Sequence, residues 1–228
     1  MQQTDPKATR PGWPEIGVGL LVLAIVGYGG GSQLYRLGLP PVAFGLVLSA
    51  LSGIAGLAGF ACAVVLRIRK LEPFGMRRIG KRWLLIGVLS GVVAFVLKAV
   101  VLVIVVELTG VDTGIQDVYG TGGSGGILSF VLATLFLAVL TPIGEEFLFR
   151  GVVANALLRY GPVIGVVGSA VIFGLMHGIN IVLPAALIAG LVAAELFRRT
   201  GSVWPGVVMH MVFNLPTIPV LVLAGTSQ

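Results

Sequence analysis

The sequence has little charge, and this deficit is the first constraint on its class. Of its 228 residues, 11% are charged and 57% are hydrophobic, and the mean hydropathy is +1.05. A soluble domain usually carries about 25% charged residues, so the composition excludes an ordinary soluble protein. A helix that crosses a bilayer needs about 20 apolar residues, and the length therefore allows roughly six to eight spans without a separate soluble domain.

Cysteine is nearly absent as well. Cys62 is the only one, and it lies in an apolar run. It cannot form a disulfide within the chain, so neither redox chemistry nor a cysteine metal cluster is expected, and we expect Cys62 to pack among apolar side chains. The net charge of +6 comes mainly from a basic segment without the interleaved aromatic residues typical of nucleic-acid binding. No nucleic-acid partner is expected.

Long apolar runs make up most of the chain. They cover residues 16–34, 40–66, 83–107, 126–158, 162–178, 181–197 and 203–223. Turn-forming pairs such as Pro40-Pro41 and Gly161-Pro162 separate them. The sequence predicts an all-α fold, a polytopic transmembrane helical bundle of about seven spans in a single integral membrane domain, residues 1–228. The first run is not followed by a cleavage motif, so we expect it to remain as a span.

Basic residues predict the orientation in the membrane. Residues 67–82 carry most of the clustered Lys and Arg residues, and the positive-inside rule places this loop in the cytoplasm. Alternation of the spans then puts Lys7 and Arg10 inside and the acidic loop of Asp112 and Asp117 outside. The expected location is the plasma membrane, with a cytoplasmic N-terminus.

Polar side chains inside the apolar runs are the candidate functional residues, because burying such groups in a bilayer costs free energy. They are Glu145, Glu146, Arg150, His177, His210 and Asn214. Glu146 and Arg150 are four residues apart on one helical face, where they can pair. Glu145 has no basic residue at the corresponding positions, which leaves its carboxylate free for chemistry. His210 and Asn214 also share a face.

The Gly161-Pro162 turn predicts that Glu145 and His177 face each other, because 161 is the midpoint between them and an antiparallel hairpin brings equidistant residues to similar depth. Thr141 and Pro142 precede the acidic pair. We expect Thr141 to cap a new helix that begins at Pro142, whose dipole would favour the carboxylates.

Simpler structural interpretations stay open for each polar residue. Glu146 and Arg150 can form an ion pair that only joins helices, and the histidines and Asn214 can be interhelical hydrogen-bonding groups. Lys98 is expected to pack or to extend toward the interface. Small-residue stripes such as Gly87/Gly91 predict close helix packing, and GTGGSGG at residues 120–126 predicts a flexible external loop.

Three motifs follow one another on separate apolar runs. They are EEFLFR with Glu145, Glu146 and Arg150, FGLMH with Phe173 and His177, and HMVFN with His210 and Asn214. This order resembles the CAAX prenyl protease and bacteriocin-processing (CPBP, Abi) family of intramembrane proteases, which includes the Ras-converting enzyme. The resemblance covers about residues 125–220, the expected catalytic core. Residues 1–124 are similar only as apolar spans with a basic loop.

The resemblance implies proteolysis at a membrane-embedded site, in some members removal of the last three residues of a prenylated C-a-a-X protein. It makes Glu145 the catalytic acid/base, Glu146 and Arg150 a supporting pair, and His177, His210 and Asn214 the remaining site residues. Peptide hydrolysis needs a base that activates water and donors that stabilise an oxyanion, and these residue types can supply both. The expected partners are a membrane-anchored protein or peptide and the lipid bilayer.

The sequence leaves two alternatives for the cofactor: a zinc ion or no metal. The family is often called a metalloprotease, and Glu145, His177 and His210 would be an acceptable zinc ligand set. The H-E-x-x-H spacing is absent, however, and a ligating Glu145 would leave only Glu146 as base. Water activated by a glutamate, without metal, is favoured.

Two functions from other classes compete with an endopeptidase. One is a non-catalytic membrane scaffold or bacteriocin-immunity factor, in which the polar residues only join helices. The other is a proton-coupled transporter, which ranks last because the sequence lacks the internal duplication common in such folds.

Overall fold

The computed structural model describes residues 10–225, and its regular structure in that range is helical throughout. The helices are α1 (Trp13–Ala24), α2 (Gly30–Arg36), α3 (Pro41–Leu66), α4 (Lys81–Thr109), α5 (Asp117–Gly123), α6 (Ile127–Leu135), α7 (Thr141–Glu146), α8 (Asn155–Leu157), α9 (Ser169–Leu175), α10 (Val182–Thr200), α11 (Trp204–Asn214) and α12 (Thr217–Gly225). Short π-helical and 3-10 segments join several of them into longer helices. The predicted all-α bundle is confirmed.

Five helices are long and apolar enough to cross a membrane. They are Trp13–Arg36, Pro41–Leu66, Lys81–Thr109, Ile127–Tyr160 and Trp204–Gly225. Of the two remaining predicted runs, 162–178 contains the shorter apolar helix Ile164–Leu175, and 181–197 lies in α10, which ends with a charged turn. The chain therefore has the helices of an integral membrane protein, and the two shorter ones complete the bundle.

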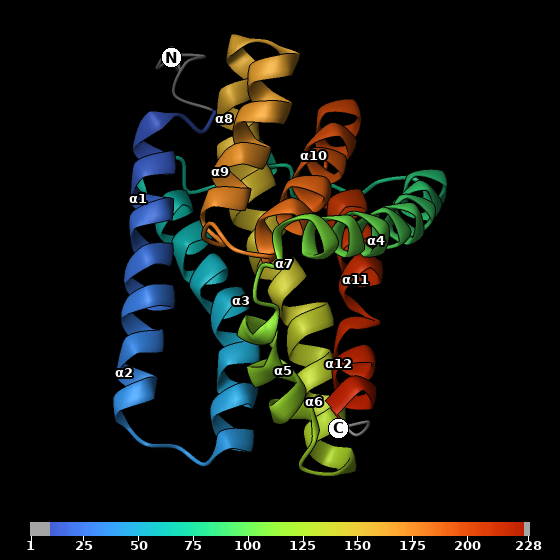
Figure 1. Cartoon of the computed structure of the whole chain (residues 1–228). Helices are drawn as coiled ribbons and strands as arrows, with labels where there is room; N and C mark the ends of the chain where they lie inside the picture. The colour runs from blue at the N-terminus through green and yellow to red at the C-terminus, as the bar shows by residue number, and fades with distance from the viewer. Residues whose placement is uncertain (1–9, 226–228) are drawn as a thin grey trace, which may run out of the picture.

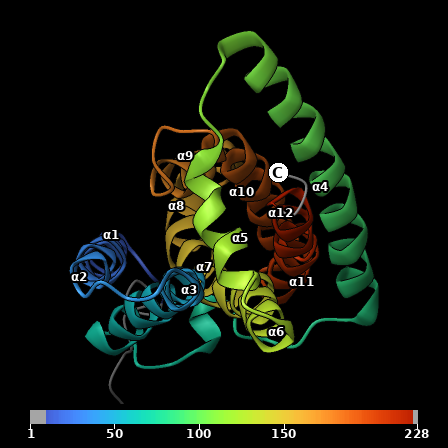
Figure 2. The ribbon, with the colours of Figure 1, turned by 60° about the horizontal axis from the view of Figure 1, so that its bottom comes forward.

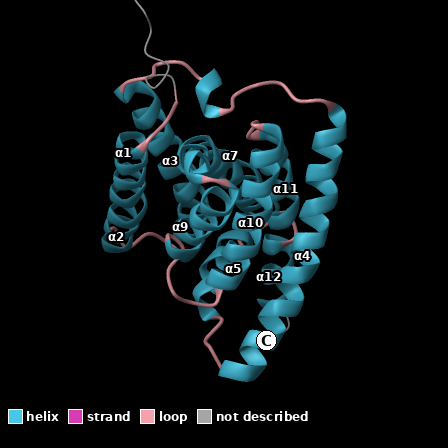
Figure 3. Cartoon of the chain, turned by 90° about the horizontal axis from the view of Figure 1, so that it is seen from above, coloured by secondary structure: helices cyan, strands magenta, loops and turns pink. Residues whose placement is uncertain are grey.

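The arrangement brings α7, α9 and α11 to the middle of the bundle. Helices α1 and α2 run end to end beside α3, and α11 and α12 lie on the opposite side of α7 (Figure 1). Helix α3 packs on α7 and α5, and α9 packs on α10. Helix α4 packs on α11 and α10 and forms the outer edge of the bundle (Figure 2). Seen from above, the other helices gather between α1 and α4 (Figure 3).

Glycine allows α3 and α7 to approach closely. A Cβ atom added to Gly144 would lie 2.0 Å from the carbonyl oxygen of Gly53, so no larger residue fits without displacing a backbone. The predicted stripe of Gly87 and Gly91 has the same function between α4 and α11, because a Cβ atom on Gly91 would lie 2.6 Å from the carbonyl oxygen of Met209. These contacts fix the depth and direction of the residues that follow Gly144.

The predicted helix start at Pro142 is wrong. The helix runs without a break from Ile127 to Tyr160, and Thr141 makes no cap: its hydroxyl donates to the backbone oxygen of Ser49 in α3 at 3.1 Å. A π-helical segment, Phe136–Leu140, comes directly before Thr141 and Pro142. Local π turns are one way in which a membrane helix tolerates proline. No helix N-terminus therefore stabilises the acidic pair.

The predicted flexible loop at 120–126 is also different in the structure. Its first half belongs to α5 (Asp117–Gly123), in which Gly120, Gly122 and Gly123 are buried. Gly122 packs against the backbone of Gly45 in α3. The glycines here allow a short helix to fit between α3 and α12, where a side chain would clash.

Candidate active site

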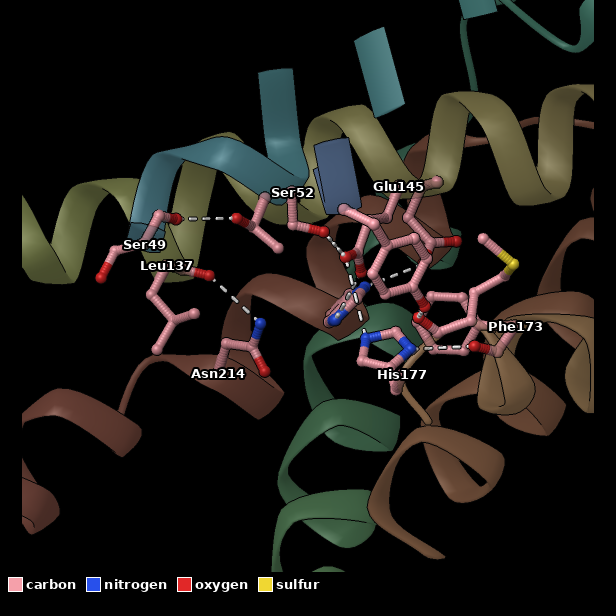
Figure 4. A network of polar contacts seen from close by, with 12 residues as sticks. Ser49, Ser52, Leu137, Glu145, Phe173, His177 and Asn214 are labelled. Atoms are coloured by element: carbon pink, nitrogen blue, oxygen red, sulfur yellow. Dashed lines mark hydrogen bonds and ion pairs between the residues drawn. The ribbon is translucent and has the colours of Figure 1, made fainter. Parts of the chain in front are cut away.

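Glu145 is buried in the centre of the bundle, and no Lys or Arg among residues 10–225 forms an ion pair with it. Its side chain is on α7, and the residue is 2% exposed. The hydroxyl of Ser52, on α3, donates to Oε1 (Figure 4). The other carboxylate oxygen, Oε2, has no hydrogen-bond partner among residues 10–225. A buried oxygen of this kind is costly unless something else binds it. Oε2 of Glu146 also lacks a hydrogen-bond partner in this part of the chain, but of the two glutamates Glu145 lines a cavity, so its free oxygen marks the position for a ligand or reactant.

Two imidazoles face this carboxylate. Nε2 of His177 lies 3.8 Å from Oε1 of Glu145, and Nε2 of His210 lies 3.9 Å from Oε2. Figure 4 shows Ser52 and His177 pointing toward Glu145. Both distances are too long for a direct hydrogen bond and suit a water molecule between the groups. The structure thus brings together the residues that the hairpin argument predicted to meet.

The partners of the opposite ring nitrogens determine which tautomers are present. Nδ1 of His177 lies 2.8 Å from the backbone oxygen of Phe173, and Nδ1 of His210 lies 2.9 Å from Oε1 of Glu146. Both oxygens are acceptors, so each Nδ1 carries the proton and donates it. In the neutral tautomer each Nε2 then presents a lone pair toward Glu145, and a water molecule between them would donate its hydrogens to these acceptors.

Glu146 and Arg150 form the expected pair, and the pair is fully buried. Nη1 of Arg150 lies 3.1 Å from Oε1 of Glu146. Nη2 of Arg150 donates to the backbone oxygens of Ala189 and Gly190 in α10 at 3.3 and 3.2 Å. The guanidinium carbon is 4.6 Å from the centre of the Phe173 ring. Arg150 thus joins α10 to the helix that carries both glutamates, and Glu146 holds the His210 ring in place.

His177 is not on a helix, which differs from the prediction. Helix α9 ends at Leu175, and His177 lies in the turn that follows. The side chain of Asn180 donates to the backbone oxygen of His177 at 2.8 Å and accepts from the backbone nitrogen of Val182 at 2.8 Å. Asn180 therefore fixes the turn against the start of α10 and supports the imidazole.

Asn214 lies near the end of the same helix as His210. Its side-chain nitrogen donates to the backbone oxygen of Leu137 at 3.1 Å (Figure 4). No direct hydrogen bond joins it to Glu145 in the part of the chain described. The second amide hydrogen remains available, because an amide nitrogen carries two.

One cavity of about 610 Å³ connects these groups, with Glu145, His177, His210 and Asn214 in its wall. Most of its other lining residues are apolar, and its size is in the range of sites that enclose a small ligand. The phenol of Tyr119, on α5, also lines it. Burial raises the pKa of Tyr119, and the charge of Glu145 raises it further. The phenol therefore stays protonated and is a hydrogen-bond donor.

The predicted zinc ligands do not form a metal site in this arrangement. Within residues 10–225, no three His, Cys, Asp or Glu side chains are placed to hold a metal ion. Tetrahedral zinc with bonds of about 2.1 Å needs ligand atoms roughly 3.4 Å apart. The nitrogens of His177 and His210 are 3.8 and 3.9 Å from the Glu145 oxygens and face different oxygens. Both separations exceed this spacing, so the three side chains are not arranged as zinc ligands in this structure.

Sequence reasoning missed Ser52, Tyr119 and Asn180. A serine in an apolar run is an ordinary residue of a membrane helix, and only the packing of α3 on α7 places Ser52 beside Glu145. Tyr119 stood in a segment expected to lie outside the bundle. Asn180 carried a usable signal, since it is a polar residue three positions after His177 and directly before an apolar run.

A comparison with protein families agrees with the three motifs. Residues 127–216 match the family model described as Type II CAAX prenyl endopeptidase Rce1-like. Searches of curated proteins and of solved structures find no match. The matched segment begins with α6 and ends just after α11, so it contains all six residues predicted for the site. For this segment, the family model supports the resemblance that the three motifs indicate.

Proposed function

We propose that the protein is an intramembrane endopeptidase that hydrolyses a peptide bond of a membrane-associated substrate with a water activated by Glu145. A prenylated protein ending in C-a-a-X is the substrate class that the family name suggests. One observation carries the proposal. The buried carboxylate of Glu145 has one oxygen that accepts no hydrogen bond among residues 10–225, and two imidazole nitrogens lie beside this carboxylate in the wall of a cavity.

The water would sit between Glu145 and the two imidazoles. It donates one hydrogen to Oε2 of Glu145 and the other to an Nε2 atom, which directs its oxygen lone pair into the cavity. As that oxygen attacks the substrate carbonyl carbon, Glu145 takes the proton. The carbon–nitrogen bond then breaks, and Glu145 returns the proton to the departing amine. The products are a new carboxyl terminus and a free peptide.

Oxyanion stabilisation falls to neutral donors on the cavity wall. The second amide hydrogen of Asn214 and the hydroxyl of Tyr119 are the candidates, because both residues line the same cavity as Glu145. Loss of one such donor typically lowers kcat by about 10²–10³.

Glu146 and Arg150 are positioning residues in this mechanism. Glu146 accepts from Nδ1 of His210 and so keeps Nε2 unprotonated and turned to the water. Arg150 neutralises Glu146, which then does not compete with Glu145 for the proton. We assign the catalytic core to residues 125–220. Residues 1–124 complete the site through Ser52 and Tyr119.

The deciding experiment is cleavage of a prenylated C-a-a-X peptide by the purified protein in detergent. We expect the wild type to cleave it and Glu145→Gln to be inactive while keeping its melting temperature. Glu107→Gln is the matched control, since Glu107 is an exposed glutamate on α4, and it should retain full activity. An active Glu145→Gln variant would exclude the mechanism. No cleavage by the wild type would favour the scaffold or immunity role.

The proposed mechanism is metal-free, and chelation tests that part separately. Activity should survive dialysis against a strong zinc chelator, and metal analysis of the active protein should give far less than one zinc per chain. Loss of activity that returns with added zinc would show that the ligand distances close around an ion.

A further inference from the structure

Lys98 is an unexplained cation in the cavity wall. It lies on α4, inside the span Lys81–Thr109, and among residues 10–225 it is the only Lys or Arg that lines the cavity. An ionisable side chain at such a place is costly and is kept where it has a partner or a function. The proposed hydrolysis at Glu145 does not use it.

The structure gives Lys98 neutral partners only. Its Nζ atom donates to the backbone oxygen of Phe213 at 3.4 Å. It also lies 4.4 Å from the centre of the Phe213 ring and 4.8 Å from that of the Phe95 ring. Among the ion pairs between residues 10 and 225, none involves Lys98. The rings and the carbonyl hold the ammonium in place, but its charge is not balanced, and an ammonium has three hydrogens to donate.

The position of the ammonium relative to the site can be bounded. The Phe213 ring centre is 6.2 Å from that of His210 and 4.4 Å from Nζ of Lys98. Adding these two distances shows that the ammonium is no more than about 11 Å from the centre of the His210 ring, which faces Glu145. Three residues of extended peptide span about 10 Å.

We propose that Lys98 binds the free C-terminal carboxylate of the substrate and so directs the cut to a bond about three residues from the chain end. This inference rests on the proposed endopeptidase function and makes Lys98 its specificity-determining residue. A carboxylate is the anion that every such substrate carries at a fixed distance from that bond. A C-a-a-X sequence has three residues after its prenylated cysteine, and when extended these can reach across the greatest possible separation of ammonium and imidazole, about 11 Å.

The test compares two prenylated peptides that differ only at the end, one with a free carboxylate and one with a C-terminal amide. The wild type should cleave the free acid with a kcat/KM about tenfold to a hundredfold higher, as expected for a hydrogen bond to a charged group. Most of the difference should be in KM, because the contact exists before the reaction. Lys98→Met should lose this preference and cleave the amide as the wild type does.

Two further variants make the result specific. Lys98→Arg keeps the charge and should retain most of the preference. Lys81→Met removes an exposed lysine at the start of the same helix and should change nothing. Equal cleavage of acid and amide by the wild type overturns the proposal without any variant. A Lys98→Met variant that loses both activities equally also overturns it and points to a lipid phosphate or a structural role. If the wild type cleaves neither peptide, the proposed endopeptidase function is overturned, and the proposed role of Lys98 is overturned with it.

Discussion

At the scale of single residues, the two adjacent glutamates differ in their surroundings. Glu146 meets a guanidinium and an imidazole, both within 3.1 Å of one oxygen. Glu145 meets a hydroxyl and two imidazoles that are too far away to bind it directly. Glu146 is tied to a cation and to the His210 ring, whereas Glu145 lines the cavity with one oxygen that accepts no hydrogen bond among residues 10–225. The division of roles follows from this contrast.

Ser52 is the residue that orients Glu145, so its removal should affect the reaction more than the fold. Ser52→Ala removes the hydroxyl that donates to Oε1. We expect kcat to fall about tenfold with little change in KM, since a hydrogen bond to a charged group is worth about 1.5–3 kcal/mol.

The matched control for this prediction is Ser49→Ala. Ser49 lies on the same helix, and its hydroxyl donates within that helix to the backbone oxygen of Gly45 at 2.7 Å. Steady-state kinetics and melting temperatures of both variants show whether Ser52 acts on the reaction or on the fold. Equal kinetics for the two variants would show that Ser52 does not position the carboxylate.

At the scale of helices, a close backbone-to-backbone approach lies next to the site. Helices α3 and α7 touch through backbone atoms at Gly53 and Gly144, and Gly144 directly precedes Glu145. A shift of either helix would separate Ser52 from the carboxylate. The backbone contact between Gly53 and Gly144 therefore sets the position of Glu145 relative to Ser52.

Gly144→Ala tests this contact. The added methyl group would lie 2.0 Å from a backbone oxygen, so the helices must separate. We expect a loss of about 1–3 kcal/mol or more in stability together with loss of cleavage.

Gly29→Ala is the comparison for this variant. Gly29 has a right-handed helical conformation, and nothing lies within 4 Å of an added Cβ atom. Its stability should stay equal or rise by up to about 1 kcal/mol. Thermal unfolding in detergent measures both variants, and equal stabilities would contradict the tight contact.

Helical periodicity and turn residues allowed much of this arrangement to be predicted. The ion pair of Glu146 with Arg150 followed from spacing of four residues, and the meeting of Glu145 with His177 followed from the turn at Gly161. The unbroken course of the helix through Pro142 could not be predicted, because the formation of a π-helical segment depends on the side chains and helices that pack around it. The burial of α5 was missed for a related reason: glycine is read as flexible in isolation, but in a bundle it allows close contact.

At the scale of the whole molecule, the orientation is a proposal that rests on the basic residues of segment 67–82. Single-cysteine variants in a Cys62→Ala background test it. Lys70 and Asp112 are both exposed and lie on opposite sides in the predicted topology.

A membrane-impermeant maleimide should label the variant Asp112→Cys on intact cells and label Lys70→Cys only after permeabilisation. Cell lysis before labelling gives the control for reactivity of each cysteine. The reverse pattern would place the N-terminus and the basic loop outside.

The uninterrupted helix Ile127–Tyr160 has a further consequence. It contains 34 residues and is therefore about 50 Å long, whereas the hydrocarbon core of a bilayer is about 30 Å thick. The mismatch requires the helix to tilt or to project beyond the acyl chains. Glu145 lies near its middle, so the depth at which a substrate must present its scissile bond changes with lipid chain length, and membrane thickness becomes a variable of the reaction.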